Sequence, residues 1–202
     1  PFHIMQKLNQ AGLVRVFLGV ENNEPEVLEV FYKHPMVNFE SVVTNVLNVL
    51  HISYHIGYIV FYPGVTIEQL RSNIYYLIHI GKIHRIGVLL EKLRIIPNTK
   101  LFEGHILLSD QIDSAYNYTF PDQKVTAIFS GIRIMFIEIL NGWYAKAEVM
   151  CTSYDLMMAY CYRIDSQYED SLSSEICYHQ CNIQHYQEIL SAYFLKVLDG
   201  VT

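Results

Sequence analysis

The chain has 202 residues, of which 51% are apolar and 17% charged, and its formal net charge is −6. This length suffices for one domain with a core, or for one domain with an appended part. Lys and Arg form no cluster, and because phosphate backbones are bound by clustered cations, the composition argues against nucleic-acid binding. No apolar run reaches the roughly 18 residues of a membrane span; the nearest, at 127–140, is interrupted by Arg133 and Glu138.

The first predicted unit is a strand, a polar turn and a helix. A short helical segment, His3–Gln10, precedes it. The apolar run Val14–Leu18 predicts a buried strand that ends at Gly19. A helix from about Pro25 to Tyr32 follows, and Pro in a first helical turn costs little because its missing N–H would have no partner there.

Two further units repeat this order. Apolar residues at helical spacing predict a helix over Phe39–Leu50, and an apolar run predicts a strand over Ile56–Phe61. Thr66 then begins a capping box, because a Gln lies three residues later, and the helix behind it stops at Gly81. A third strand is predicted over Val88–Ile96. Strand–helix repeats with nearly continuous apolar strands indicate a parallel sheet.

The alternation ends after Leu101. A polar, tyrosine-containing stretch, Ser109–Gln123, reads as a loop, residues 124–164 have a helical pattern, and a final amphipathic helix is predicted over Glu175–Leu198. We therefore expect two parts, an α/β part over residues 1–110 and a helical part over residues 111–202.

Several short segments resemble radical S-adenosylmethionine enzymes. They are QAGL at 10–13, VFLGVE at 16–21 with Lys33 twelve residues on, GYIVFYPGVT at 57–66 and LRIIPNTKL at 93–101. Their order and spacing resemble the later strands of that family's partial barrel, over about residues 5–105. These segments are most similar to one branch of the family, whose members often carry an N-terminal cobalamin-binding domain.

This resemblance implies an α/β fold: the later half of a partial TIM-type (β/α) barrel with parallel strands, followed by a helical C-terminal extension. It implies that the chain binds S-adenosylmethionine. With a [4Fe–4S] cluster, the whole enzyme would generate a 5′-deoxyadenosyl radical, with cobalamin as a further cofactor in the branch named above. The substrate would be a small molecule or a peptide.

The resemblance also implies five cofactor-binding residues. Glu21 would lie against the ribose or methionine part of S-adenosylmethionine, and Lys33 would pair with its carboxylate. Ile59 and Ile96 would pack on the adenine, and Gly57 would permit close backbone approach. From the residues alone, Glu21 and Lys33 are equally charges that suit the two ends of the intervening helix dipole, and the two isoleucines are ordinary core residues.

The family's CxxxCxxC motif is absent, because no cysteine precedes Cys151. Cluster ligands are thiolates, so the ligands would lie outside this chain, in a missing N-terminal half or in a partner chain. Cys151, Cys161, Cys177 and Cys181 have spacings that suit helix faces, and we expect no metal on them. Without a secretory signal they predict reduced thiols and a cytoplasmic protein.

Two other functions remain open. One is a non-catalytic partner that kept the later strands, lost the cluster and binds a peptide or another subunit, because an open half-sheet needs its edges covered. The other is an unrelated α/β enzyme. The sequence assigns no catalytic residue. The chain is part of an enzyme only if the cluster ligands are supplied from outside it.

Overall fold

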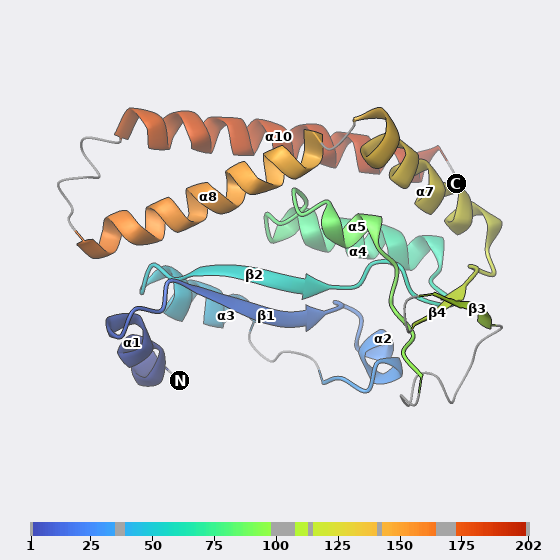
Figure 1. Cartoon of the computed structure of the whole chain (residues 1–202), viewed down its shortest axis with the longest axis horizontal. Helices are drawn as coiled ribbons and strands as arrows, with labels where there is room; N and C mark the ends of the chain where they lie inside the picture. The colour runs from blue at the N-terminus through green and yellow to red at the C-terminus, as the bar shows by residue number, and fades with distance from the viewer. Residues whose placement is uncertain are drawn as a thin grey trace.

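The computed structural model describes residues 2–34, 39–97, 108–112, 115–140, 143–164 and 173–200. Helices surround a small parallel sheet of β1 (Arg15–Glu21) and β2 (Ser53–Tyr58) (Figure 1). The longest helices, α8 (Trp143–Ile164) and α10 (Ser173–Asp199), run past each other on the β2 side of this sheet.

The parallel pairing of the first two strands confirms the α/β prediction for this part of the chain, while two strands do not amount to a partial barrel. The register pairs Gly19 with Gly57 and then shifts by one residue, so that Glu21 pairs with Tyr58. A bulge of this kind increases the local twist and redirects the side chain that follows. The shift lies at the carboxyl end of β1, where Glu21 is found.

The predicted third strand, Val88–Ile96, is wrong over its first part. Residues Gly87–Leu90 form a short helix, α5, which buries Leu89 and Leu90 completely or nearly so. A short apolar run fits a buried helix turn as well as a buried strand, so periodicity could not separate them. Only afterwards does the chain extend, where Lys92 forms a parallel bridge with Phe61 and the Leu93 N–H donates to the Phe61 carbonyl at 2.7 Å.

The predicted loop over Ser109–Gln123 is also corrected. Strands β3 (Leu108–Ile112) and β4 (Ala115–Tyr118) pair antiparallel within it. Tyrosine has a high strand propensity, and that signal outweighs the polarity of the stretch. The Lys92 ammonium donates to the Tyr118 carbonyl at 2.5 Å and thereby ties this hairpin to the extended segment after α5.

The helix predictions are confirmed with small changes. The described helices before β3 are α1 (Phe2–Gln10), α2 (Pro25–Val30), α3 (Phe39–Val42), which continues as the π-helical η1 (Val43–Asn48), α4 (Ile67–His79) and α5. The capping box of α4 is complete, because Thr66 Oγ1 accepts from the Gln69 N–H at 3.2 Å and Gln69 Oε1 accepts from the Thr66 N–H at 3.0 Å. After α4 the chain reverses at Gly81, with φ of +64°.

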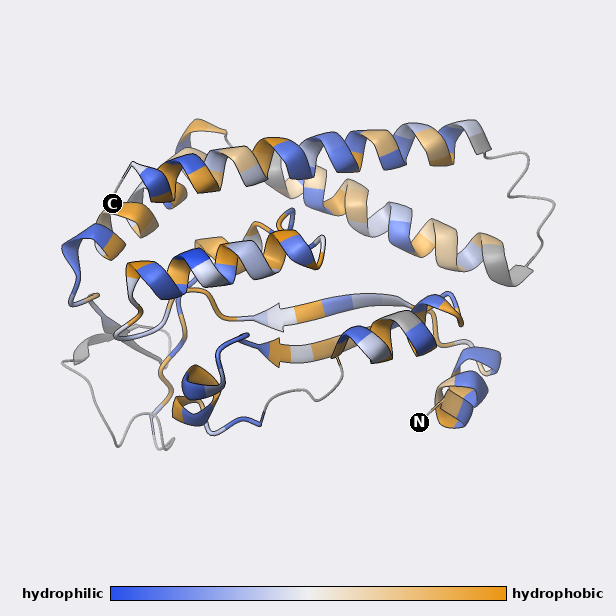
Figure 2. Cartoon of the chain, turned by 180° about the vertical axis from the view of Figure 1, so that it is seen from behind, coloured by the Kyte–Doolittle hydropathy of each residue, from blue (hydrophilic) through white to orange (hydrophobic). Residues whose placement is uncertain are grey.

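The C-terminal helices pack on the sheet part through one shared core. They are α7 (Gln123–Arg133), the π-helical η2 (Ile134–Ile139), α8 and α10. Ile56 of β2, Leu77 of α4, Val125 of α7 and Phe194 of α10 belong to a single buried cluster. Hydrophobic and hydrophilic residues alternate along α8 and α10 (Figure 2). Within the described ranges, no helix is long and apolar enough to cross a membrane. The division at residue 110 stays a prediction.

Candidate functional site

An open groove lies between β2 and the segment that follows α5. Its volume is about 420 Å³, within the usual range for small-molecule sites. The first two residues of the short helix α5, Gly87 and Val88, form part of the groove's wall. It is lined by Phe17, His55, Ile56, Gly57, Tyr58, Ile59, Gly87, Val88, Glu91, Lys92, Leu93, Arg94 and Glu148.

The two faces of the sheet have different environments. Tyr58 is buried and stacks on Tyr76 of α4, and Ile56 lies in the core. On the opposite face, Phe17 stacks on His55 with ring centroids 5.9 Å apart, and 68% of Phe17 is exposed. Alternation of side chains along a strand produces this division. The face that carries Phe17 and His55 is the one that opens to the groove.

Two of the predicted cofactor residues, Gly57 and Ile59, line this groove. A Cβ at position 57 would lie 2.6 Å from the Phe17 ring, so the absence of a side chain there allows the ring to lie directly over the backbone. Ile59 is half-buried against the core. Sequence reasoning missed Phe17, although its place two residues before Gly19 on β1 puts it on the same face as Gly57.

Glu21 and Lys33 lie together at the carboxyl end of β1, outside the residues that line the groove. Glu21 Oε1 is 3.6 Å from Lys33 Nζ, and their side chains are 22% and 56% exposed. Glu21 has φ of +64°, and its carboxylate turns back over Gly19, where a Cβ would meet Oε1 at 3.0 Å. The Ile59 N–H donates to the Glu21 carbonyl at 2.7 Å, so the strand end and the groove are neighbours.

Ile96, the fifth predicted residue, is 53% exposed and does not line the groove. The structure thus brings Gly57 and Ile59 together in the groove and Glu21 and Lys33 together beside it. Ile96 joins neither pair.

A buried polar network fixes the turn that carries Glu21. Asn22 is buried, its side-chain amide donates to the Ile59 carbonyl at 3.0 Å, and its Oδ1 accepts from the Glu24 N–H at 2.9 Å. The Tyr58 hydroxyl lies between the side-chain amides of Asn23 and Asn73, 2.8 Å from Asn73 Oδ1. Burial raises the pKa of Tyr58. This network holds the loop between β1 and α2 in one conformation.

His55 is a titratable group that lines the groove. The Arg15 guanidinium donates to its Nδ1 at 3.1 Å, and because Arg has no acceptor, the proton of the neutral ring is on Nε2. Burial, with Arg85 and Arg15 nearby, lowers the pKa of His55 to about 4. His55 is therefore neutral near pH 7 and has one N–H available.

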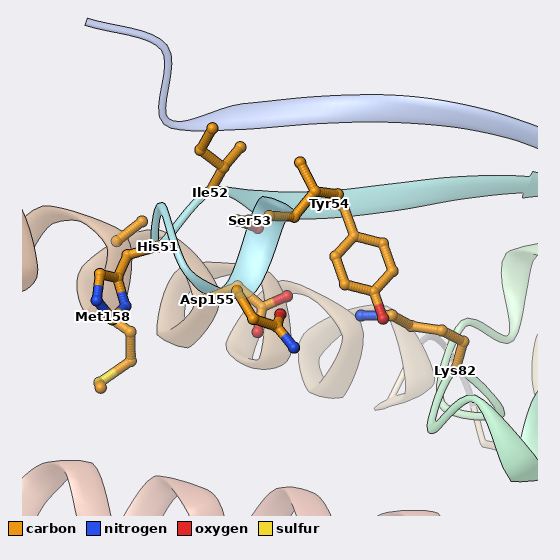
Figure 3. A pocket seen from close by; sticks show the side chains of 10 residues that line it. His51, Ile52, Ser53, Tyr54, Lys82, Asp155 and Met158 are labelled. Carbon is orange, nitrogen blue, oxygen red and sulfur yellow. The ribbon is translucent and has the colours of Figure 1, made fainter. Parts of the chain in front are cut away.

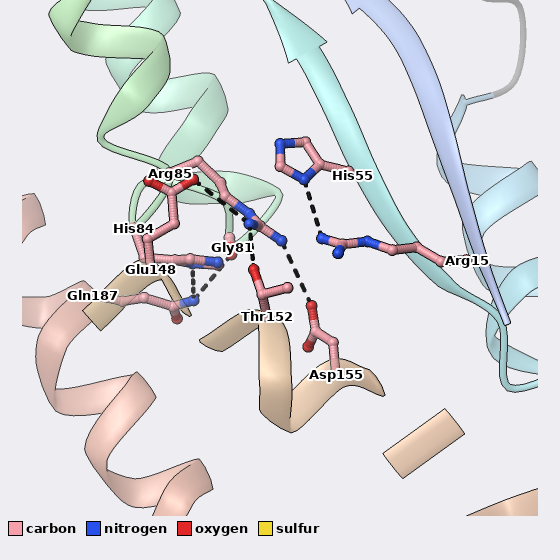
Figure 4. Close-up of polar contacts among 9 residues, drawn as sticks. All are labelled: Arg15, His55, Gly81, His84, Arg85, Glu148, Thr152, Asp155 and Gln187. Atoms are coloured by element: carbon pink, nitrogen blue, oxygen red, sulfur yellow. Dashed lines mark hydrogen bonds and ion pairs between the residues drawn. The ribbon is translucent and has the colours of Figure 1, made fainter. Parts of the chain in front are cut away.

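Behind the groove, Arg85 forms the centre of a buried ionic cluster (Figure 4). Arg85 is 1% exposed; its guanidinium donates to Thr152 Oγ1 at 2.8 Å and lies 3.6 Å from Glu148 and 3.8 Å from Asp155, all on α8. Nearby, His84 bonds to Gln187 Nε2 at 2.9 Å. Burial lowers the pKa of His84 to about 3. The sequence analysis missed this cluster; the signal was three basic residues at positions 82–85 between apolar neighbours.

The cysteines do not converge. Cys151 and Cys161 are buried on α8, and Cys177 and Cys181 are exposed on α10. Among the described residues, no group of three or more His, Cys, Asp or Glu side chains is arranged to hold a metal ion. The described residues therefore do not fit an iron–sulfur cluster.

No family model and no curated protein matches the sequence. Among solved structures, the chain matches one described as "Structure of Cobalamin-dependent S-adenosylmethionine radical enzyme OxsB with aqua-cobalamin bound". The TM-score is 0.54 at 13% sequence identity, and the match covers 100% of this chain and 40% of that chain. At this identity the likeness shows a distantly related fold, and the chain spans less than half the length of its neighbour.

Proposed function

We propose that the chain is the S-adenosylmethionine-binding part of a radical S-adenosylmethionine enzyme, with the ligands of its [4Fe–4S] cluster outside this chain. The observation that carries the proposal is the structural match to OxsB over the whole chain. The motif resemblance at residues 10–21, 57–66 and 93–101 supports it independently, because it rests on the sequence and not on the fold.

The groove supplies a fitting site for the cofactor. The adenine would lie beside Ile59, on the exposed ring of Phe17, since flat aromatic groups stack favourably. The ribose and methionine part would extend toward Glu21, which is joined to Ile59 by a backbone hydrogen bond. Lys33 and Glu21 offer one charge each for the cofactor's carboxylate and ammonium.

The chain's own residues would bind and orient the cofactor. The turn at Asn22 and Asn23 fixes Glu21, and neutral His55 presents a hydrogen-bond donor without adding charge. The bound S-adenosylmethionine would supply the 5′-deoxyadenosyl group for radical chemistry. In a cobalamin-dependent relative, cobalamin would be bound elsewhere in the complete enzyme.

Calorimetric titration with S-adenosylmethionine tests the proposal on the full chain. We expect saturable binding that Glu21→Gln weakens by roughly tenfold or more, because a charged hydrogen bond contributes about 1.5–3 kcal/mol. Lys33→Met should cost less, since Lys33 is more exposed. Gly57→Val should weaken binding too, because its side chain displaces the Phe17 ring.

Glu26→Gln, an exposed carboxylate on α2, is the matched control and should bind as the wild type does. Absence of binding at millimolar S-adenosylmethionine would contradict the proposal and favour the alternative, a non-catalytic subunit built on the same fold.

A further inference from the structure

A second cavity lies at the opposite, amino end of β2. Its volume is about 300 Å³, and it shares no lining residue with the groove described above. It is formed by the start of β2, the turn after α4 and the C-terminal half of α8 (Figure 3). Its lining residues are Leu47, Asn48, His51, Ile52, Ser53, Tyr54, Lys82, Asp155, Met158 and Ala159.

Two polar groups point into this cavity side by side. The Lys82 ammonium lies 4.0 Å from the centre of the Tyr54 ring. The ammonium and the Tyr54 hydroxyl lie beside each other in Figure 3. Lys82 is only 9% exposed, yet among the described residues no carboxylate lies within 4.0 Å of its ammonium. The Tyr54 hydroxyl likewise has no hydrogen-bond partner in the described parts of the chain.

The charges around the cavity do not balance. Lys82, Arg85 and Arg15 interact electrostatically with Asp155, and Arg85 is also paired with Glu148. Three cations thus share two carboxylates. Nearby His55 and His84 add no charge near pH 7, because burial and these same cations lower their pKa values to about 4 and about 3.

An unbalanced charge in a shielded place is unfavourable until a counter-charge is added. Lys82 shows the effect, since burial and then the neighbouring Arg85 and Arg15 lower its pKa, with only Asp155 and Cys151 opposing. The Asp155 carboxylate is already 3.8 Å from Arg85. Among the described residues, neither Lys82 nor Arg15 has a carboxylate within 4.0 Å, and Arg15 donates to His55. Of these two cations, Lys82 is the one that lines the cavity.

We propose that this cavity binds a small organic anion, whose carboxylate or phosphate group contacts the Lys82 ammonium and the Tyr54 hydroxyl. The rest of the ligand is short, because the volume is small, and it packs against the apolar part of the lining, Leu47, Ile52, Met158 and Ala159. The polar part of the lining, Asn48, His51 and Ser53, offers hydrogen-bonding groups beside it. The site is separate from the proposed S-adenosylmethionine groove and does not depend on that assignment.

Titration of the isotope-labelled full chain, followed by amide NMR shifts, tests the site with benzoate, phenyl phosphate and uncharged benzamide. We expect benzoate or phenyl phosphate to shift resonances of residues 52–54, 82 and 155 in a saturable manner, with benzamide at least tenfold weaker. Saturation by only one of the two anions identifies the head group. Equal binding of benzamide, or no saturable shift with either anion, overturns the proposal.

Two variants test the contacts themselves. Lys82→Met should weaken anion binding roughly tenfold to a hundredfold, as expected for a lost charged hydrogen bond, and Tyr54→Phe about two- to tenfold. The controls are Lys196→Met and Tyr178→Phe, which alter positions away from the cavity and should bind as the wild type does. Unchanged affinity in Lys82→Met overturns the proposal. If Lys82→Met does not fold, Tyr54→Phe provides the test instead. This variant should fold, because it keeps the ring that packs beside Lys82, and an unchanged affinity in it overturns the proposal.

Discussion

Replacing Arg85 by Met should destabilise the protein far more than replacing a charged residue on the surface. The Arg85 side chain is 2% exposed and lies 3.6 Å from Glu148 and 3.8 Å from Asp155. Its removal leaves two carboxylates and the Thr152 hydroxyl without their cation. Removing one partner of a buried ion pair costs about 3–5 kcal/mol. Because the carboxylates are themselves 23% and 30% exposed, we expect a loss near the lower end, about 3 kcal/mol.

Urea denaturation followed by circular dichroism measures this loss at pH 7. The deficit relative to wild type should shrink at pH 5, because burial already raises the pKa of Asp155 and loss of Arg85 raises it further, so that its carboxyl becomes neutral. For the same reason, adding Asp155→Asn to Arg85→Met should restore part of the stability.

Arg71→Met is the matched control. Arg71 makes a shorter ion pair, 2.7 Å to Asp199, but on the surface, so its removal should leave the urea midpoint close to that of the wild type. A midpoint for Arg85→Met equal to that of Arg71→Met would refute the argument that the cluster is buried and charged.

Three further predictions concern other parts of the fold. Tyr58→Phe should lower the free energy of unfolding by about 1–3 kcal/mol in urea denaturation, because it leaves the buried Asn73 amide without its partner; a loss no larger than that of Tyr178→Phe would contradict the network. Thr66→Ala should cost about 0.5–2 kcal/mol in thermal or urea unfolding by removing the cap of α4, and an unchanged midpoint would show that the cap contributes nothing. Burial lowers the pKa of His84 to about 3 in the folded state, below its unfolded value, so the stability that its neutral ring contributes is complete above about pH 6.5 and is lost as the pH falls. Between pH 7 and pH 5 we expect the free energy of unfolding to fall by about 2 kcal/mol, and His84→Gln should abolish this fall.

Local signals predicted the helices well. The capping box at Thr66, the stop at Gly81 and the helical spacing of residues 39–50 each concern neighbours within a few positions, and each is confirmed. The parallel pairing of the first two strands also followed from local patterns, because short strand–helix repeats restrict the topology. The strand predicted at 88–96 failed over residues 88–90, because its apolar run is too short to show a period.

The site depends on contacts that no local pattern contains. Arg85 meets Glu148 and Asp155, which lie more than sixty residues later in the chain. Lys82, which no described carboxylate pairs with, becomes significant only because α8 forms the cavity wall beside it. Gly57 was singled out for close approach, but the group that approaches it in this structure is the Phe17 ring.

The most direct test of the central claim is the position of the adenine ring on the chain. With isoleucine methyl groups labelled and S-adenosylmethionine at saturation, we expect nuclear Overhauser contacts between the adenine protons and the δ1-methyl group of Ile59, a residue that lines the groove. Ile52, in the cavity at the other end of β2, serves as the internal comparison. Contacts to Ile52 in place of Ile59, or no saturable binding at all, would contradict the account.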